Sequence, residues 1–344
     1  MGKFYDGTKL LSMKDINGNV PEIFMCTTNR SAGKTTYFNR LMVNRFIKNG
    51  SKFALIYRFN YELDDVAEKF FKDIGSLFFN GRNFTSKRMA AGCYHDLFLD
   101  GNHCGYALAL NQADMIRKLS HIFSDVTCML FDEFQSETGH YCSGEVTKFI
   151  SVHMSVARGQ GQQSRYVPVY MISNCVTILN PYYVALNISD RLQANTNFLR
   201  GDGWILENGF VEEASTAQKE SLFNRAFSSH KYIAYSAENV YLNDSKAFIE
   251  KMNGDGRYVA TIRYEGCDYS IKSFLDKGIM YCDDKCDPTY PLKITVTTED
   301  HQINYVMLKH NSVFLSGMRD LFSKGAFRFK NMKCKNAILK ALSY

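Results

Sequence analysis

The sequence predicts an α/β protein with a parallel-rich sheet, followed by a smaller α+β domain. In the first 200 residues, short apolar runs alternate with segments of helical periodicity. Strands that are apolar on both faces and alternate with helices indicate a parallel sheet covered on both sides. After residue 244 the pattern becomes strand-rich and ends in a basic helical region. The length of 344 residues, of which 45% are apolar and 22% charged, suits a globular chain of at least two domains.

The expected elements of the first part follow from the positions of apolar side chains. Residues 34–49 place Phe38, Leu41 and Met42 at helical spacing, and Gly50 is a typical helix stop. Continuous apolar runs predict the strands, and amphipathic spacing predicts the other helices. The expected strands are 22–28, 52–59, 102–110, 126–132 and 166–173, and the other expected helices are 61–74 and 148–157.

Three domains are expected: residues 1–200, a helical linker or lid at 201–244, and a C-terminal domain at 245–344. The only tryptophan, Trp204, lies among glycines where the pattern changes, and residues 212–227 are polar and helix-prone. A C-terminal domain of about 100 residues has a common size. Its expected strands are 258–264, 267–271, 279–282 and 293–298.

The charge and the cysteines limit the class of protein. The net charge is +6, and the segment from Arg319 to Tyr344 holds seven Lys and Arg residues against one acid. Such a basic end suits a polyanion such as nucleic acid, or is a solvated helix face. The ten cysteines show no disulfide framework, so we expect the protein to work in a reducing cytosol. The close pair Cys282 and Cys286 lacks a second pair with zinc-ligand spacing, so we expect no structural zinc. No apolar run reaches the length of a membrane span.

The strongest local signal is TNRSAGKTT, which follows an expected strand and opens an expected helix. This is the context of a phosphate-binding loop, in which Gly33 allows close approach, Lys34 contacts the phosphates and Thr35 binds Mg²⁺. Arg30 is a further phosphate-contact candidate, whereas Thr28 replaces the first glycine of the pattern. The simpler alternative is an ordinary strand–turn–helix corner. The candidate nucleotide-binding residues are Thr28, Asn29, Arg30, Ser31, Ala32, Gly33, Lys34, Thr35 and Thr36.

The second signal is an acidic pair, Asp132 and Glu133, at the end of the apolar run VTCMLFD. Neighbouring side chains of a strand point to opposite sides. Asp132 is therefore expected to hold a water on Mg²⁺, while Glu133 polarises the attacking water. A carboxylate base beside the metal-site Asp is typical of one class of ATPases, whereas small GTPases use a glutamine. The alternative is a solvated turn.

Other polar residues follow the remaining expected strands and helices. Asn174, at the end of the strand that begins near Tyr166, is a candidate sensor of the γ-phosphate or of the attacking water, or else part of a turn. Arg158, in the Gly/Gln-rich stretch ARGQGQQSR, is the candidate arginine finger that acts on a neighbouring subunit's nucleotide. Arg165 competes for that role, and a plain surface arginine is the alternative.

Arg58 and Asn60 lie where the expected strand at 52–59 ends. In a parallel sheet this end lies near the phosphate loop. Either side chain could contact Glu133 or a nucleotide across a subunit boundary.

These residues together resemble a known family, the DNA-packaging ATPases of small tailed phages with protein-primed replication. The family consists of short relatives of the large terminase subunits. The resemblance covers nearly the whole chain and is weakest at residues 75–125 and in the connector. The strings that support it are VNRFIKNG at 43–50, GKTT at 33–36, LFDEF at 130–134, ISN and NPYY within 172–183, FIEK at 248–251 and FRF at 327–329.

The resemblance implies a P-loop NTPase of the additional-strand, catalytic-glutamate type that uses ATP and Mg²⁺. It implies a motor that moves double-stranded DNA into a preformed procapsid through the portal, as a homomeric ring of typically five subunits. The lid after Gly201 would shift with hydrolysis, and the loops at 80–87 and 138–143 are candidates for DNA contact. The protein would act in the cytoplasm of the infected host cell and transiently on the procapsid.

The resemblance also implies that the C-terminal domain has a ribonuclease-H-like fold and meets DNA or a packaging RNA. A two-metal nuclease needs several clustered carboxylates. The expected first strand, 258–264, contains no acid, and Asp283, Asp284 and Asp287 lie in a loop-like run. We therefore expect a vestigial nuclease domain without nuclease activity.

Three other functions remain open at this point. The first is a P-loop helicase, or a DNA pump for replication or transfer, with the same ATP chemistry. The second is a nuclease with an auxiliary ATPase. The third is a non-enzymatic capsid-associated binding protein, which predicts no ATP turnover.

Overall fold

The computed structural model describes residues 4–189, 191–192, 196–238, 248–254 and 256–342. The chain forms two compact units, Met1–Asn243 and Asp244–Tyr344, and each is described by itself. The expected boundary at 244/245 lies in residues 239–247, outside the described part. The further division of the first unit into an ATPase domain and a lid stays a prediction.

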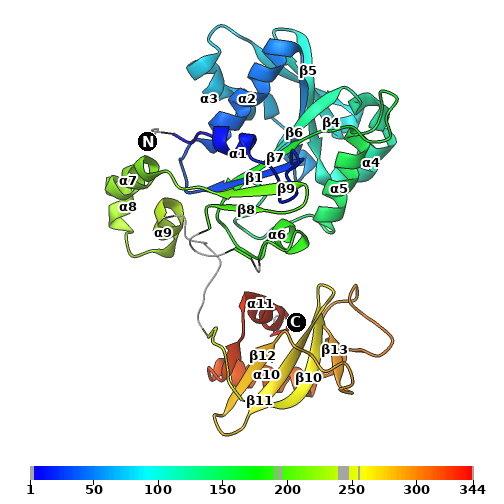
Figure 1. Ribbon diagram of the computed structural model, residues 1–344, viewed down its shortest axis with the longest axis vertical. Helices are drawn as coiled ribbons and strands as arrows, with labels where there is room; N and C mark the ends of the chain where they lie inside the picture. The colour runs from blue at the N-terminus through cyan, green and yellow to red at the C-terminus, as the bar shows by residue number, and fades with distance from the viewer. Residues whose placement is uncertain (1–3, 190, 193–195, 239–247, 255, 343–344) are drawn as a thin grey trace. The chain divides into compact units, whose positions relative to one another are not determined.

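A large mixed sheet forms the centre of the first unit (Figure 1). Its strands follow the order β3-β4-β5-β2-β6-β7-β1-β9-β8, and all pairs from β5 to β9 are parallel. The outer pairs β3–β4, β4–β5 and β8–β9 are antiparallel. The strands are β1 (Ile23–Thr28), β2 (Lys52–Tyr57), β3 (Phe84–Met89), β4 (Tyr94–Leu99), β5 (Asn102–Ala109), β6 (Val126–Asp132), β7 (Val169–Asn174), β8 (Phe198–Arg200) and β9 (Trp204–Asn208).

Helices cover both faces of this sheet, so the expected α/β architecture is confirmed. One core contains Phe38 and Met42 of α2, and the other contains Phe149 of α5; all three side chains are buried. Full burial of such a side chain contributes roughly 1.5–3 kcal/mol. One face is packed by α1 (Thr8–Ser12), α2 (Lys34–Asn49) and α3 (Val66–Phe78), and the other by α4 (Ala113–Lys118), α5 (Glu145–Val156) and α6 (Pro181–Ala185).

Several observed elements differ from those expected. The expected helix at 61–74 is split into a 3-10 turn, Asn60–Leu63, and α3, because Asp65 takes a left-handed conformation between them. The hairpin of β3 and β4 was not predicted, because β3 is a polar edge strand without an apolar run. It overlaps the loop that we expected at 80–87, so that candidate for DNA contact is in large part a strand.

The expectation of a helical connector from residue 201 is wrong at its beginning. β9 lies in this segment, and it pairs with β1 in the large sheet. Burial of Trp204, Ile205 and Leu206 explains why it joins the sheet. Three helices follow: α7 (Glu212–Glu220), α8 (Leu222–Ala226) and α9 (Lys231–Glu238). The helix-prone segment at 212–227 contains α7 and α8, which are separated at Ser221 because its backbone is not helical (ψ 128°).

The second unit is an α+β domain around a six-stranded sheet formed by its described residues. The strand order is β14-β13-β10-β11-β12-β15; β10–β11 and β11–β12 are antiparallel, and the other pairs are parallel. Leu315 and Met318 of one helix and Ile338 of the other pack into its core. The elements are β10 (Arg257–Tyr264), β11 (Cys267–Phe274), β12 (Ile279–Asp283), β13 (Lys293–Thr295), β14 (Val306–Met307), α10 (Ser312–Ser323), β15 (Phe327–Phe329) and α11 (Met332–Leu342).

Across the described residues, no helix combines the length and the hydropathy needed to cross a bilayer.

Candidate active site

Three parallel strands bring the predicted site residues to one edge of the large sheet. β7 lies between β1 and β6, so the carboxyl ends of all three strands are adjacent. The register pairs Thr28 with Asn174, and Asp132 with Ile172. The predicted phosphate loop, the acidic pair and Asn174 therefore meet, although up to 146 positions separate them in the chain.

Lys34 is the first residue of α2, and its side chain is buried. The preceding Gly33 has φ +93°, a left-handed conformation that glycine adopts without steric cost. The Lys34 Nζ donates to Oδ1 of Asn174 at 2.6 Å. Burial lowers the pKa of Lys34, while the nearby Asp132 carboxylate raises it. The loop thus holds a desolvated ammonium group beside Asp132.

Asp132 and Glu133 differ in their surroundings. Burial raises the pKa of Asp132, whereas Lys34 and a hydrogen bond from the Thr35 side chain lower it. Glu133 has an exposed side chain, and its φ of +55° is unusual for a residue other than glycine. Partial desolvation raises the pKa of Glu133, and the carboxylates of Asp132 and Glu137 raise it further. Its backbone N–H donates to Oδ1 of Asp132 at 2.8 Å.

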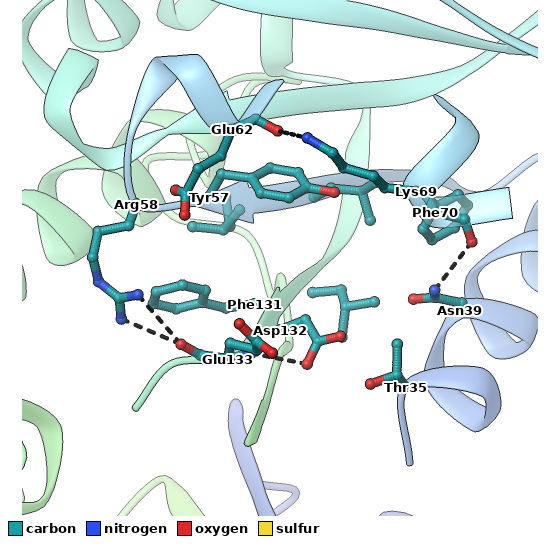
Figure 2. A pocket seen from close by; sticks show the side chains of 13 residues that line it. Thr35, Asn39, Tyr57, Arg58, Glu62, Lys69, Phe70, Phe131, Asp132 and Glu133 are labelled. Atoms are coloured by element: carbon teal, nitrogen blue, oxygen red, sulfur yellow. Dashed lines mark hydrogen bonds between the residues drawn. The ribbon is translucent and has the colours of Figure 1, made fainter. Parts of the chain in front are cut away.

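A cavity of about 360 Å³ lies beside the acidic pair (Figure 2). Thr35, Asp132 and Glu133 line one side, and Tyr57 and Arg58 line another. A second cavity, of about 720 Å³, borders the same loop, and Lys34 and Thr35 also line it. Its other lining residues are Phe4, Tyr5, Ser31, Gly33, Thr36, Tyr37, Arg40, Leu77 and Phe78.

A family model for podovirus DNA encapsidation proteins (Gp16) matches residues 1–342. This chain belongs to that family. The DNA packaging protein of Bacillus phage phi29 is 26% identical over 343 residues, which cover 97% of this chain and 95% of the relative. The DNA packaging protein of Bacillus phage B103 is 24% identical over 306 residues, with 88% and 90% covered. The expected family resemblance is confirmed.

A solved chain of the bacteriophage Phi-29 viral genome packaging motor assembly has a similar fold. Its TM-score is 0.69 at 24% identity, and the match covers 100% of this chain and 98% of that one. The Phi-28 gp11 DNA packaging motor matches with a TM-score of 0.58 at 15% identity, with 100% and 99% covered. These likenesses extend over both units of this Gp16-family protein.

The side chains at the start of the loop make contacts that the sequence did not predict. Asn29 is buried, and its amide exchanges two hydrogen bonds of 3.0 Å with the backbone of Val211. The Arg30 guanidinium contacts Glu137 and Tyr232. The contacts with Val211 and Tyr232 join the loop to the segment that contains α7–α9, and the contact with Glu137 joins it to the segment after β6.

Thr28, Ser31 and Ala32 also hold the loop in place through hydrogen bonds. Thr28 is buried and its hydroxyl donates to the Asn29 carbonyl at 2.9 Å. The Ser31 hydroxyl accepts from Gln218 of α7 at 2.9 Å. Ala32 is buried, and its carbonyl accepts from the Tyr5 N–H at 2.8 Å. These contacts fix the path of the loop.

Neither candidate finger arginine lines either of these two cavities. Arg158 is exposed just after α5. Arg165 donates to the carbonyls of Val126, at 3.1 Å, and Val156, at 2.7 Å. Val126 begins β6, so Arg165 lies at the opposite edge of the sheet from Asp132.

Arg58 contacts Glu133 within the same chain, and it is held there by Glu145. The Arg58 Nε donates to both oxygens of Glu145, at 3.0 and 2.8 Å, and the guanidinium also donates to the Glu133 carbonyl. Asn60 instead exchanges hydrogen bonds with Asn111, at 2.9 and 3.0 Å. Sequence reasoning missed Glu145, which lies 87 positions from Arg58 and belongs to no local motif.

The acids of the second unit pair with lysines. Asp283 accepts from Lys272 at 3.0 Å and from Lys330 at 2.9 Å, and Lys330 also contacts Asp284. The Asp287 carboxylate accepts from the backbone N–H of Thr289 at 2.8 Å. In the part of the chain that the structure describes, no three His, Cys, Asp or Glu side chains are grouped to hold a metal ion.

Proposed function

We propose that this Gp16-family protein is the ATP-hydrolysing motor that moves double-stranded viral DNA through the portal into a preformed procapsid. Family membership and the relatives named DNA packaging proteins support the packaging role. One observation supports ATP hydrolysis above all others. Thr35 and the acidic pair Asp132 and Glu133 line a single cavity beside the buried Lys34.

The residues present fit ATP and Mg²⁺. Thr35 and Asp132 offer a hydroxyl and a carboxylate in contact with each other, and oxygen atoms are the ligands that Mg²⁺ prefers. Bound Mg²⁺ supplies charge neutralisation to the phosphates. Lys34 and the N–H groups of the first turn of α2 would hold the phosphates, because those N–H groups have no partner within the helix.

Glu133 would act as the general base that accepts a proton from the attacking water. Its raised pKa suits this role, because a base works best when its pKa approaches the working pH. Asn174, which contacts Lys34, would sense the terminal phosphate or hold the water. The position of β7 between β1 and β6, together with the adjacent acids, supports the additional-strand, catalytic-glutamate class.

Arg158 would act on the nucleotide of a neighbouring subunit in a homomeric ring, which we propose to contain five subunits. The engagement of Arg165 by two backbone carbonyls favours Arg158 for this role. An arginine finger stabilises the charge that develops on the transferred phosphoryl group. The protein would work in the host cytoplasm and transiently on the procapsid.

The second unit would bind nucleic acid, either DNA or a packaging RNA, and would not cleave it. The order β14-β13-β10-β11-β12, with antiparallel pairs only among β10, β11 and β12, supports a ribonuclease-H-like fold. Asp283 and Asp284 contact lysines, which compete with metal ions for the same oxygens. A vestigial nuclease domain accounts for both features.

The substitution Glu133→Gln tests the hydrolytic role. We expect ATP turnover, measured with and without duplex DNA, to fall by about 10²- to 10⁴-fold, because the general base is lost. Binding of a fluorescent ATP analogue should persist. The matched control is Glu68→Gln, which changes an exposed glutamate of α3 that pairs with Lys72. Undiminished turnover by Glu133→Gln would refute the assignment of the base.

A further inference from the structure

Arg58 lies at the centre of a buried polar cluster directly behind Glu133. Only 7% of Arg58 and 3% of Glu145 are exposed. A buried charge is tolerated when it is paired and hydrogen-bonded, and both requirements are met here. Burial alone would lower the pKa of the guanidinium, but the Glu145 carboxylate raises it, so Arg58 remains charged.

Besides Arg58, two further groups hold Glu145. One oxygen accepts from the Tyr182 hydroxyl at 2.9 Å, and the other accepts from the Cys142 N–H at 2.9 Å. Glu145 also begins α5, where the helix dipole favours a negative charge. The position of the Arg58 guanidinium is therefore fixed from outside the active site.

The side of the guanidinium that does not contact Glu145 faces the backbone carbonyls of Glu133 and Phe134. Its terminal nitrogens donate to the Glu133 carbonyl at 3.4 and 3.3 Å (Figure 2). One of them also donates to the Phe134 carbonyl at 2.9 Å. The rings of Phe131 and Tyr141 lie 5.5 and 5.0 Å from the guanidinium carbon. The planar fork thus bridges two successive carbonyls.

Glu133 needs such support because its backbone is left-handed. A side-chain-bearing residue keeps this conformation only when its surroundings over-determine it. The N–H of Glu133 is held by Asp132, and its carbonyl by Arg58. Together these two contacts set the direction in which the Glu133 carboxylate leaves the strand.

We infer that Arg58, fixed by Glu145, is a positioning residue that holds the backbone of Glu133 so that its carboxylate faces the cavity beside Thr35. It acts within its own subunit and through Glu133. The inference rests on the proposed function, because it gives Arg58 a part in hydrolysis by Glu133.

The test compares Arg58→Lys and Glu145→Gln with the unchanged full-length chain. Lysine keeps the charge but loses the planar fork, and glutamine keeps the volume but loses the charge. We expect kcat for ATP to fall by about 10- to 100-fold, because a small misplacement of a catalytic group costs this much. KM and the Kd of a fluorescent ATP analogue should change less than about threefold, since ground-state binding is untouched.

The matched control is Arg45→Lys. Arg45 belongs to α2, and its guanidinium donates to the Tyr170 hydroxyl at 2.8 Å, away from Glu133. The kcat of the Arg45→Lys variant should equal that of the unchanged chain. In the Glu133→Gln background, Arg58→Lys should lower the residual turnover by less than about twofold, because residues that act through one another are not additive.

Three results would overturn the inference: unchanged kcat in both variants, loss of ATP-analogue binding in both, or unfolding of both at the assay temperature. The last two would make Arg58 and Glu145 residues of the fold alone. The proposed function fails separately, if Glu133→Gln itself retains turnover. Loss of turnover in Glu133→Gln with undiminished kcat in Arg58→Lys would remove only the positioning role.

Discussion

Each unit of the protein contains a cluster of lysine and aspartate side chains, and the two clusters differ in how completely their charges are paired. In the first unit, burial lowers the pKa of Lys34 and raises that of Asp132. In the second, the two Asp carboxylates raise the pKa of Lys330. Burial alone would raise the pKa of Asp283, but hydrogen bonds from Lys330 and Lys272 lower it to about 2.

The difference shows which cluster is suited to a ligand. Charged groups whose desolvation is not fully compensated gain when a counter-charge binds, as phosphates and Mg²⁺ would in the first unit. Charged groups that already satisfy one another gain little. The second cluster therefore stabilises its own domain, although its acids resemble the remains of a metal site in the sequence.

The largest effect that separates the two clusters is on ATP turnover. Replacing Lys34 by Met removes the charge that we propose holds the phosphates, and we expect turnover to fall by at least about 100-fold. Replacing Lys330 by Met should leave basal turnover within about twofold, because its partners belong to the second unit. Steady-state phosphate release by the two variants checks this. Comparable losses in both would show that the clusters are not separate in function.

The next largest effect is on stability, and we expect it in the second unit and not in the first. Lys330→Met leaves Asp283 and Asp284 without their shared partner, so we expect the second unit to lose about 1–3 kcal/mol. Hydrogen exchange of the β12 amides measures this loss. Lys324→Met is the control, because its exposed pair with Asp320 is worth under about 0.5 kcal/mol. Equal changes in both variants would contradict a structural role for the Lys330 cluster.

The sequence predicted the first cluster better than the second. The loop at Thr28–Thr36 and the acids after β6 lie in a strand–loop–helix order that local pattern specifies, and α2 and β6 have the expected bounds. No local pattern joins Lys272 and Lys330 to Asp283, because strand pairing brings them together. The sequence therefore singled out the acids, but not their lysine partners.

The same limit applies within the active site. Lys34, Thr35 and Asp132 were predicted because their chemistry depends on residue type and spacing. The contacts of Arg58 with Glu145 depend instead on where the turn after β2 meets the start of α5. Hydrogen bonds between distant side chains follow from tertiary packing, which a single sequence does not encode in any short window.

The smallest predicted effect is on acid stability. The folded pKa of Asp283 is about 2, against an ordinary 3.8, so its contribution is present above about pH 4 and is lost as the pH falls toward 2. The folded pKa of Asp132 is raised, so protonation of that group favours the folded first unit. Between about pH 4 and pH 2, we expect the free energy of unfolding of the second unit to fall by about 1 kcal/mol, allowing for solvent screening. Hydrogen exchange in β10–β12 follows the second unit, and fluorescence of Trp204, the only tryptophan, follows the first. Lys330→Met should reduce the pH dependence of the second unit, because Asp283 then loses one of its two lysine partners. An acid loss of the same size in that variant would mean that other carboxylates cause it.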